Sequence, residues 1–108
     1  MNNNLIEEYE MLKESLDSIL PFDVYPTREL VQLLRDKFPI TLKSSLSVSS
    51  LLNTGDYGGL TCTIEFEKQA LVCSLTHLII PTDNPFYKEI CMYQDKRTKK
   101  LQKQNKFR

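Results

Sequence analysis

Apolar residues recur at steps of three and four near the start of the chain, which is typical of a helix with one apolar face. This pattern covers residues 4–20, and its stripe consists of Leu5, Tyr9, Leu12, Leu16 and Ile19. Pro21 ends the helix because proline cannot continue it. We expect the stripe to pack on the domain's own sheet, with pairing to the same helix of a second copy as the alternative.

Two further helices follow from capping residues and apolar spacing. After a proline-bracketed loop at 21–26, residues 28–38 form a short helix with Thr27 as its N-cap. The last helix begins with Asn84 as N-cap and Pro85 in the first helical position. Its inner stripe consists of Phe86, Ile90, Tyr93, Arg97 and Leu101.

Between these helices the apolar period changes to two, which is typical of half-buried strands. In the first strand, about 42–53, Leu42, Leu46, Val48 and Leu52 occupy even positions, and in the second, 60–67, the even positions are all apolar. A third strand covers 70–80. With Lys68 and Gln69 as a two-residue loop, Phe66 faces Leu71, Ile64 faces Cys73 and Cys62 faces Leu75.

The predicted fold is therefore α+β: a single domain, residues 1–108, in the order ααβββα, with a three-stranded antiparallel meander. A winged helix is the alternative. "YPTRELVQLLRDKF" resembles the second helix of such domains, "TLKSSLSVSSLL" would be the recognition helix, and "GGLTCTIEFEKQALVCSLTH" would be the wing. Period two in the supposed recognition helix argues against it.

Composition and charge place the chain among ordinary globular proteins. It has 108 residues, 41% of them hydrophobic and 26% charged. Three cysteines are an odd number for a disulfide framework, so we expect a cytoplasmic protein with reduced thiols. No apolar run is long enough for a membrane span, and the start lacks a signal-peptide layout, so we expect no membrane partner.

Positive charge gathers in residues 96–108, which contain no acid, whereas the first twenty residues are acidic. On a helix the basic residues form one exposed face, suited to a phosphate backbone. The predicted contacts are Lys96, Arg97, Lys99, Lys100 and Lys103. The alternatives are a solvated helix end, pairing with the acidic first helix, and binding of another acidic protein.

All three glycines lie within five positions, in "NTGDYGGLTC", residues 53–62. A turn that needs positive φ explains them. A second interpretation is a loop that contacts a partner or an anion through Asp56, Tyr57, Gly58 and Gly59. The loop matches no phosphate-binding or dinucleotide motif.

Catalytic chemistry has one candidate pair, Cys62 with His77, the only histidine. Both are expected on the covered face of the sheet, so we expect no enzyme activity. Cys73 and His77 lie ~13 Å apart along a strand, too far apart for one zinc ion. Cys62 and Cys73 are expected on a diagonal, too far apart for an unstrained disulfide. We predict no metal and no cofactor.

The sequence thus favours a small non-enzymatic interaction or regulatory module that self-associates as a homodimer. The predicted dimer face is the outer face of the third strand, where Val72, Leu78 and Ile80 lie among Ser74 and Thr76. The alternative function is a nucleic-acid-binding regulator that uses the basic C-terminal helix.

Overall fold

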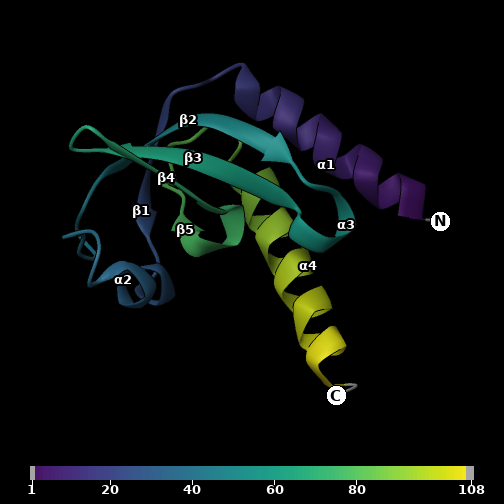
Figure 1. Ribbon diagram of the computed structural model, residues 1–108. Helices are drawn as coiled ribbons and strands as arrows, with labels where there is room; N and C mark the ends of the chain where they lie inside the picture. Colours follow the sequence, from purple (N-terminus) through teal and green to yellow (C-terminus); the bar gives the residue numbers. More distant parts are fainter. Residues whose placement is uncertain (1, 107–108) are drawn as a thin grey trace.

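A curved antiparallel sheet with helices packed on one face forms the protein (Figure 1). The structure is a computed structural model that describes the backbone of residues 2–106 and the side chains of residues 7–55 and 58–100. The described elements are α1 (Asn2–Asp17), β1 (Phe22–Pro26), α2 (Arg28–Leu34), β2 (Leu46–Asn53), α3 (Gly55–Gly58), β3 (Leu60–Phe66), β4 (Gln69–Ser74), the 3₁₀ turn η1 (Leu75–His77), β5 (Leu78–Ile79) and α4 (Tyr87–Lys106).

The described sheet has five strands in the order β4-β3-β2-β1-β5. The α+β class is confirmed, whereas the three-stranded meander is only part of the sheet. The winged-helix alternative placed its recognition helix at residues 41–52, but residues 46–52 belong to strand β2, so that alternative is wrong. No helix in the described part of the chain has the length and apolar character needed to cross a membrane.

The proline-bracketed segment predicted as a loop is strand β1. Its side chains alternate between core and solvent, with Phe22, Val24 and Pro26 buried. It pairs antiparallel with β2, Val24 lying opposite Leu46. The two prolines led to the prediction of a loop, but proline is tolerated at strand ends, where a missing N–H breaks no ladder bond.

A β-bulge in β2 reverses the predicted alternation. Val48 pairs with Ile64 and Ser50 with Thr63, so Ser49 is an extra residue in the ladder. After the bulge the odd positions face the core: Leu51 is buried, and Leu52, predicted inside, is 61% exposed.

The predicted hairpin of β3 and β4 exists, with its turn one residue earlier. Glu67 and Lys68 both have positive φ (47° and 67°) and form the two-residue loop. The register is shifted by two residues, so each side chain keeps its predicted face but changes its partner. Leu71 lies opposite Ile64, and Cys73 lies directly opposite Cys62.

The predicted third strand, 70–80, is broken after Ser74. The Ser74 hydroxyl accepts a hydrogen bond from the Thr76 N–H and begins the 3₁₀ turn. The chain then crosses to the other edge of the sheet as β5, which pairs with β1. The turn shifts the alternation, so Leu78 and Ile80 are buried and the predicted dimer face does not exist.

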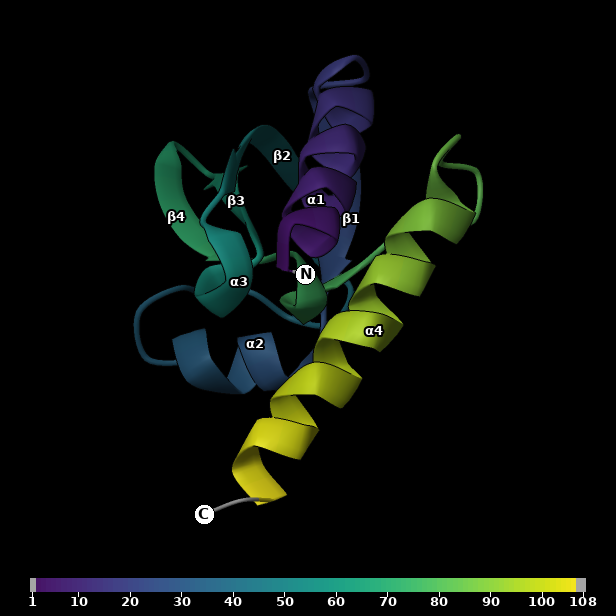
Figure 2. The same ribbon diagram turned by 90° about the vertical axis from the view of Figure 1, so that its right-hand side faces the viewer.

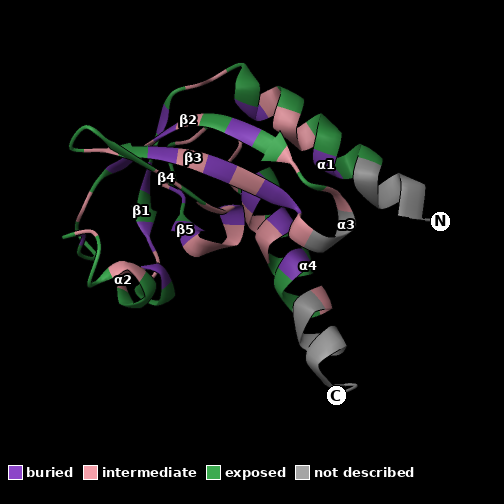
Figure 3. Ribbon diagram, in the orientation of Figure 1, coloured by how far each residue is buried: buried purple, intermediate pink, exposed green. Residues whose placement is uncertain are grey.

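Helices α1 and α4 lie on the same side of the sheet and diverge from each other (Figure 2). Each places buried side chains in one common core: Tyr9 and Leu16 from α1, and Ile90 and Tyr93 from α4 (Figure 3). The Gln94 amide anchors α4 because it donates hydrogen bonds to the backbone carbonyls of Leu75 and Leu78 at 2.9 and 2.7 Å. These bonds hold α4 against the segment that joins β4 to β5.

Candidate functional site

The space between α1 and α4 has a floor of two tyrosines. The rings of Tyr9 and Tyr93 meet edge to face, with centroids 5.2 Å apart and planes at 77°. Tyr93 Oη accepts a hydrogen bond of 2.8 Å from the Leu60 N–H, at the start of β3. Burial raises the pKa of Tyr93, so its hydroxyl remains protonated. The floor therefore ties both helices to the sheet.

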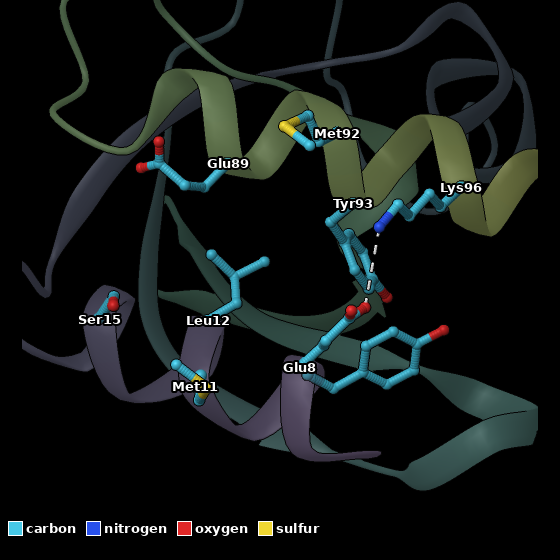
Figure 4. Close-up of a pocket in the computed structure, with 9 residues that line it drawn as sticks. Glu8, Met11, Leu12, Ser15, Glu89, Met92, Tyr93 and Lys96 are labelled. Atoms are coloured by element: carbon cyan, nitrogen blue, oxygen red, sulfur yellow. Dashed lines mark ion pairs between the residues drawn. The ribbon is translucent and has the colours of Figure 1, made fainter. Parts of the chain in front are cut away.

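Above this floor lies an open groove of about 320 Å³ (Figure 4). Met11 on α1 and Met92 on α4 stand at its rims and are 68% and 60% exposed. The remaining lining residues are Glu8, Leu12, Ser15, Glu89 and Lys96, together with the two tyrosines. Lys96 Nζ lies 3.9 Å from Glu8 Oε2 at one end, while Ser15 and Glu89 lie at the other. We call this surface the α1–α4 groove.

The glycine loop packs against the back of this floor. Gly59 is buried at φ +64°, and a Cβ there would meet the Tyr93 hydroxyl and lie 3.0 Å from Arg97 Nε. A Cβ on Gly58 would meet the Thr54 hydroxyl, and Gly55 has φ +82°. Close approach and positive φ thus account for the glycines. The side chains of Asp56 and Tyr57 lie outside the described residues, so a contact through them stays a prediction.

The basic residues of α4 do not form a single exposed row. Arg97 is 3% exposed and lies behind the floor, with Nη1 3.5 Å from Tyr9 Oη. Lys96 faces Glu8, and Lys99 Nζ lies 3.1 Å from Asp95 Oδ2. Lys100 is partly buried, and the side chain of Lys103 lies outside the described residues. The glycine loop and the basic helix meet through the buried packing of Gly59 against Arg97.

The predicted pair of Cys62 and His77 does not share the expected register, because His77 lies in the 3₁₀ turn after β4 ends. Cys62 is fully buried, and burial raises its pKa far above the ordinary thiol value. Burial also raises the pKa of Cys73 to about 11. Thiolates, the reactive form, are therefore disfavoured at both positions. Among the residues whose placement is described, no three His, Cys, Asp or Glu side chains gather as a metal site.

Sequence reasoning missed the groove because its walls come from opposite ends of the chain. Met11 and Met92 carried no motif, and the only signal was that each is an apolar residue outside its helix's inner stripe. Comparison with protein-family models, curated proteins and solved structures finds no match to this chain, so the geometry of the groove carries the functional argument.

Proposed function

We propose that the protein is a cytosolic, non-enzymatic interaction module that binds a basic amphipathic helix of a partner protein in the α1–α4 groove. Self-association as a homodimer is part of the same proposal and uses a different surface. The observation that carries the proposal is that two exposed methionines, Met11 and Met92, face each other across a groove whose floor consists of buried tyrosines.

The size and lining of the groove suit apolar side chains. A cavity of about 150 Å³ holds a benzene ring, so a groove of about 320 Å³ has room for roughly two such side chains. Methionine is unbranched and polarizable, and it adapts to irregular partners in binding grooves. Met11 and Met92 can therefore close over side chains inserted between them.

The walls and charges of the groove favour a basic helix as occupant. Both walls are helices, and an amphipathic helix fits such a groove by placing its apolar face between them. The solvent side of α1 carries the exposed acids Glu7, Glu8, Glu10 and Glu14, and Glu89 stands at the end of the groove. Lysine or arginine beside the inserted apolar residues would complement these carboxylates.

The test uses the methionine methyl groups as reporters. The chain has three methionines, so a ¹³C-methyl NMR spectrum can be assigned by substitution. A synthetic helical peptide with leucines at i, i+3, i+4 and i+7 and lysines on both flanks should shift the Met11 and Met92 signals in a saturable way. An acidic peptide with the same leucines serves as the charge control and should bind more weakly.

Met92→Glu leaves Met11 as the reporter and should abolish its shift, whereas Leu33→Glu should leave the shifts of both methionines unchanged. Leu33 is a matched control because it is 67% exposed on α2 and does not line the groove. Exposed positions of this kind change stability by about 0.5 kcal/mol or less, so folding should be retained. Binding that persists in Met92→Glu, or no response to the peptide at millimolar concentration, would reject the groove as the site.

Nucleic-acid binding through the basic part of α4 is the second candidate. Lys96 and Lys99 are 61% and 69% exposed, and their acidic neighbours Glu8 and Asp95 are 58% and 66% exposed. Exposed ion pairs are weak, so these lysines could exchange a carboxylate for a phosphate. Such binding would be sequence-independent and sensitive to salt.

A further inference from the structure

Strand β4 forms an edge of the sheet and lacks the usual protection of an edge. It pairs with β3 on one side, and no strand of the described residues follows it on the other. Its sequence, QALVCS, contains no charged residue and no proline. Natural edge strands are kept short or carry lysine, proline or a bulge, because free N–H and C=O groups recruit another strand. The opposite edge, β5, follows this rule with only two residues.

The hairpin register shows which backbone groups of β4 point outward. In a two-residue hairpin the residues flanking the loop, Phe66 and Gln69, form a hydrogen-bonded pair. Pairs then alternate, so Leu71 and Cys73 direct their N–H and C=O groups toward β3. Ala70, Val72 and Ser74 direct theirs toward the free edge. Val72 is also 69% exposed.

We propose that two copies of the chain pair antiparallel through β4, with Val72 of both copies facing each other on the two-fold axis. This inference rests on the self-association proposed above and names its surface. In this register Ala70 lies opposite Ser74 of the other copy, so every outward residue forms a pair that exchanges both backbone hydrogen bonds. Moving the register by two residues would leave one outward residue without a pair, because either Ser74 would lie against the Lys68 turn or Ala70 would lie against Thr76 in the 3₁₀ turn.

The side chains agree with the same register. Val72 meets its own copy on the outer face, where a β-branched pair is favourable. On the core face Leu71 lies opposite Cys73 of the other copy, and both are only partly buried in a single chain. No like charges oppose each other within the strand, and the hydrophobic core becomes continuous across the two sheets. Pairing thus covers the apolar side chains that the edge leaves partly open.

Two measurements test the pairing. Light scattering should give a mass near twice 12.6 kDa at high concentration that falls toward 12.6 kDa on dilution. Residue-resolved hydrogen exchange should show protection of the Ala70, Val72 and Ser74 amides only at high concentration. The Leu71 and Cys73 amides should be protected at both concentrations, because they bond to β3.

Val72→Pro should give a monomer, since it removes one outward N–H and keeps the bonds to β3; proline is tolerated on a strand edge of this kind. Val72→Thr keeps the N–H and the branched shape and should stay dimeric. Continued protection of Leu71 and Cys73 in Val72→Pro shows that the hairpin has folded. A dimer that Val72→Pro leaves intact would overturn the β4 surface while self-association stands, and a monomeric wild type at millimolar concentration would overturn both.

Discussion

Gly59→Ala should destabilise the fold far more than the same change at Gly55, although each adds one methyl group. Gly59 has φ +64° and ψ −145°, a backbone region that is essentially restricted to glycine. Holding another residue there costs about 1–3 kcal/mol. The added Cβ would also run into the Tyr93 hydroxyl and lie 3.0 Å from Arg97 Nε.

Displacement of Tyr93 lowers the free energy of unfolding by a second amount. Its hydroxyl accepts the buried Leu60 N–H at 2.8 Å, and a buried donor left without a partner costs about 1–3 kcal/mol. Together the two costs are about 2–6 kcal/mol, a large part of the ~5–15 kcal/mol that stabilises a typical domain. At Gly55, with φ +82° and no atom within 4 Å, only conformational strain of about 1–2 kcal/mol is expected.

Urea denaturation of both variants measures this difference as a shift of the midpoint at constant slope. Tyr93→Phe provides the decisive background, because it removes the hydroxyl that the new Cβ would meet. In that background Gly59→Ala should keep its backbone strain and the close contact with Arg97 but no longer cost the Leu60 hydrogen bond, so the two substitutions should be strongly non-additive. Equal costs at Gly59 and Gly55, or additivity with Tyr93→Phe, would refute the close-approach argument.

Two further predictions follow from the thiols and the lysines. Because burial raises the pKa of Cys73 to about 11 from an ordinary 9.0, its alkylation should be slow at pH 8 and accelerate as the pH rises toward 11, with Cys62 slower still. Above pH 9 the folded chain then holds more protons than the unfolded chain, so the free energy of unfolding should fall as the pH rises. Mass spectrometry can follow the alkylation, and rapid labelling of Cys62 would contradict its burial and favour a catalytic role. The second candidate function predicts that the protein binds duplex DNA with an affinity that falls steeply as the salt concentration rises. Replacing Lys96 and Lys99 with glutamine should weaken this binding, whereas the control Lys68→Gln, in the β3–β4 turn, should have no effect.

Local chemistry predicted several elements correctly. The Thr27 side chain accepts the Leu30 N–H at the start of α2, as expected of an N-cap. The last helix was predicted to begin at Pro85 with Asn84 as its N-cap, but α4 begins at Tyr87, and Asn84 Oδ1 accepts the Phe86 N–H at 2.8 Å in the turn that precedes it. Alternation also identified β3 as a strand and fixed the inner face of the β3–β4 hairpin, because neither depends on residues far away in the sequence.

The errors arose where one residue changed the alternation or where distant segments met. The bulge at Ser49 and the 3₁₀ turn after Ser74 each reversed inside and outside, so Leu52 became exposed and Leu78 became buried. The sequence gives no signal of the bulge or of the 3₁₀ turn at these two positions, because serine is common in strands and turns alike. The α1–α4 groove was equally hidden, because its rims come from residues 11 and 92.

Tyr93 is the residue at which the scaffold and the proposed groove meet. Its ring forms the floor under Met11 and Met92, and its hydroxyl fixes the start of β3, the strand that pairs with β4. A substitution at Tyr93 would therefore disturb the groove, the glycine loop and the sheet together, and a loss of binding there would not identify a contact. Met92 lies one residue earlier, is 60% exposed and bears none of these bonds. For this reason a substitution at the rim, such as Met92→Glu, can show a loss of partner binding without a loss of folding, whereas a substitution at Tyr93 cannot.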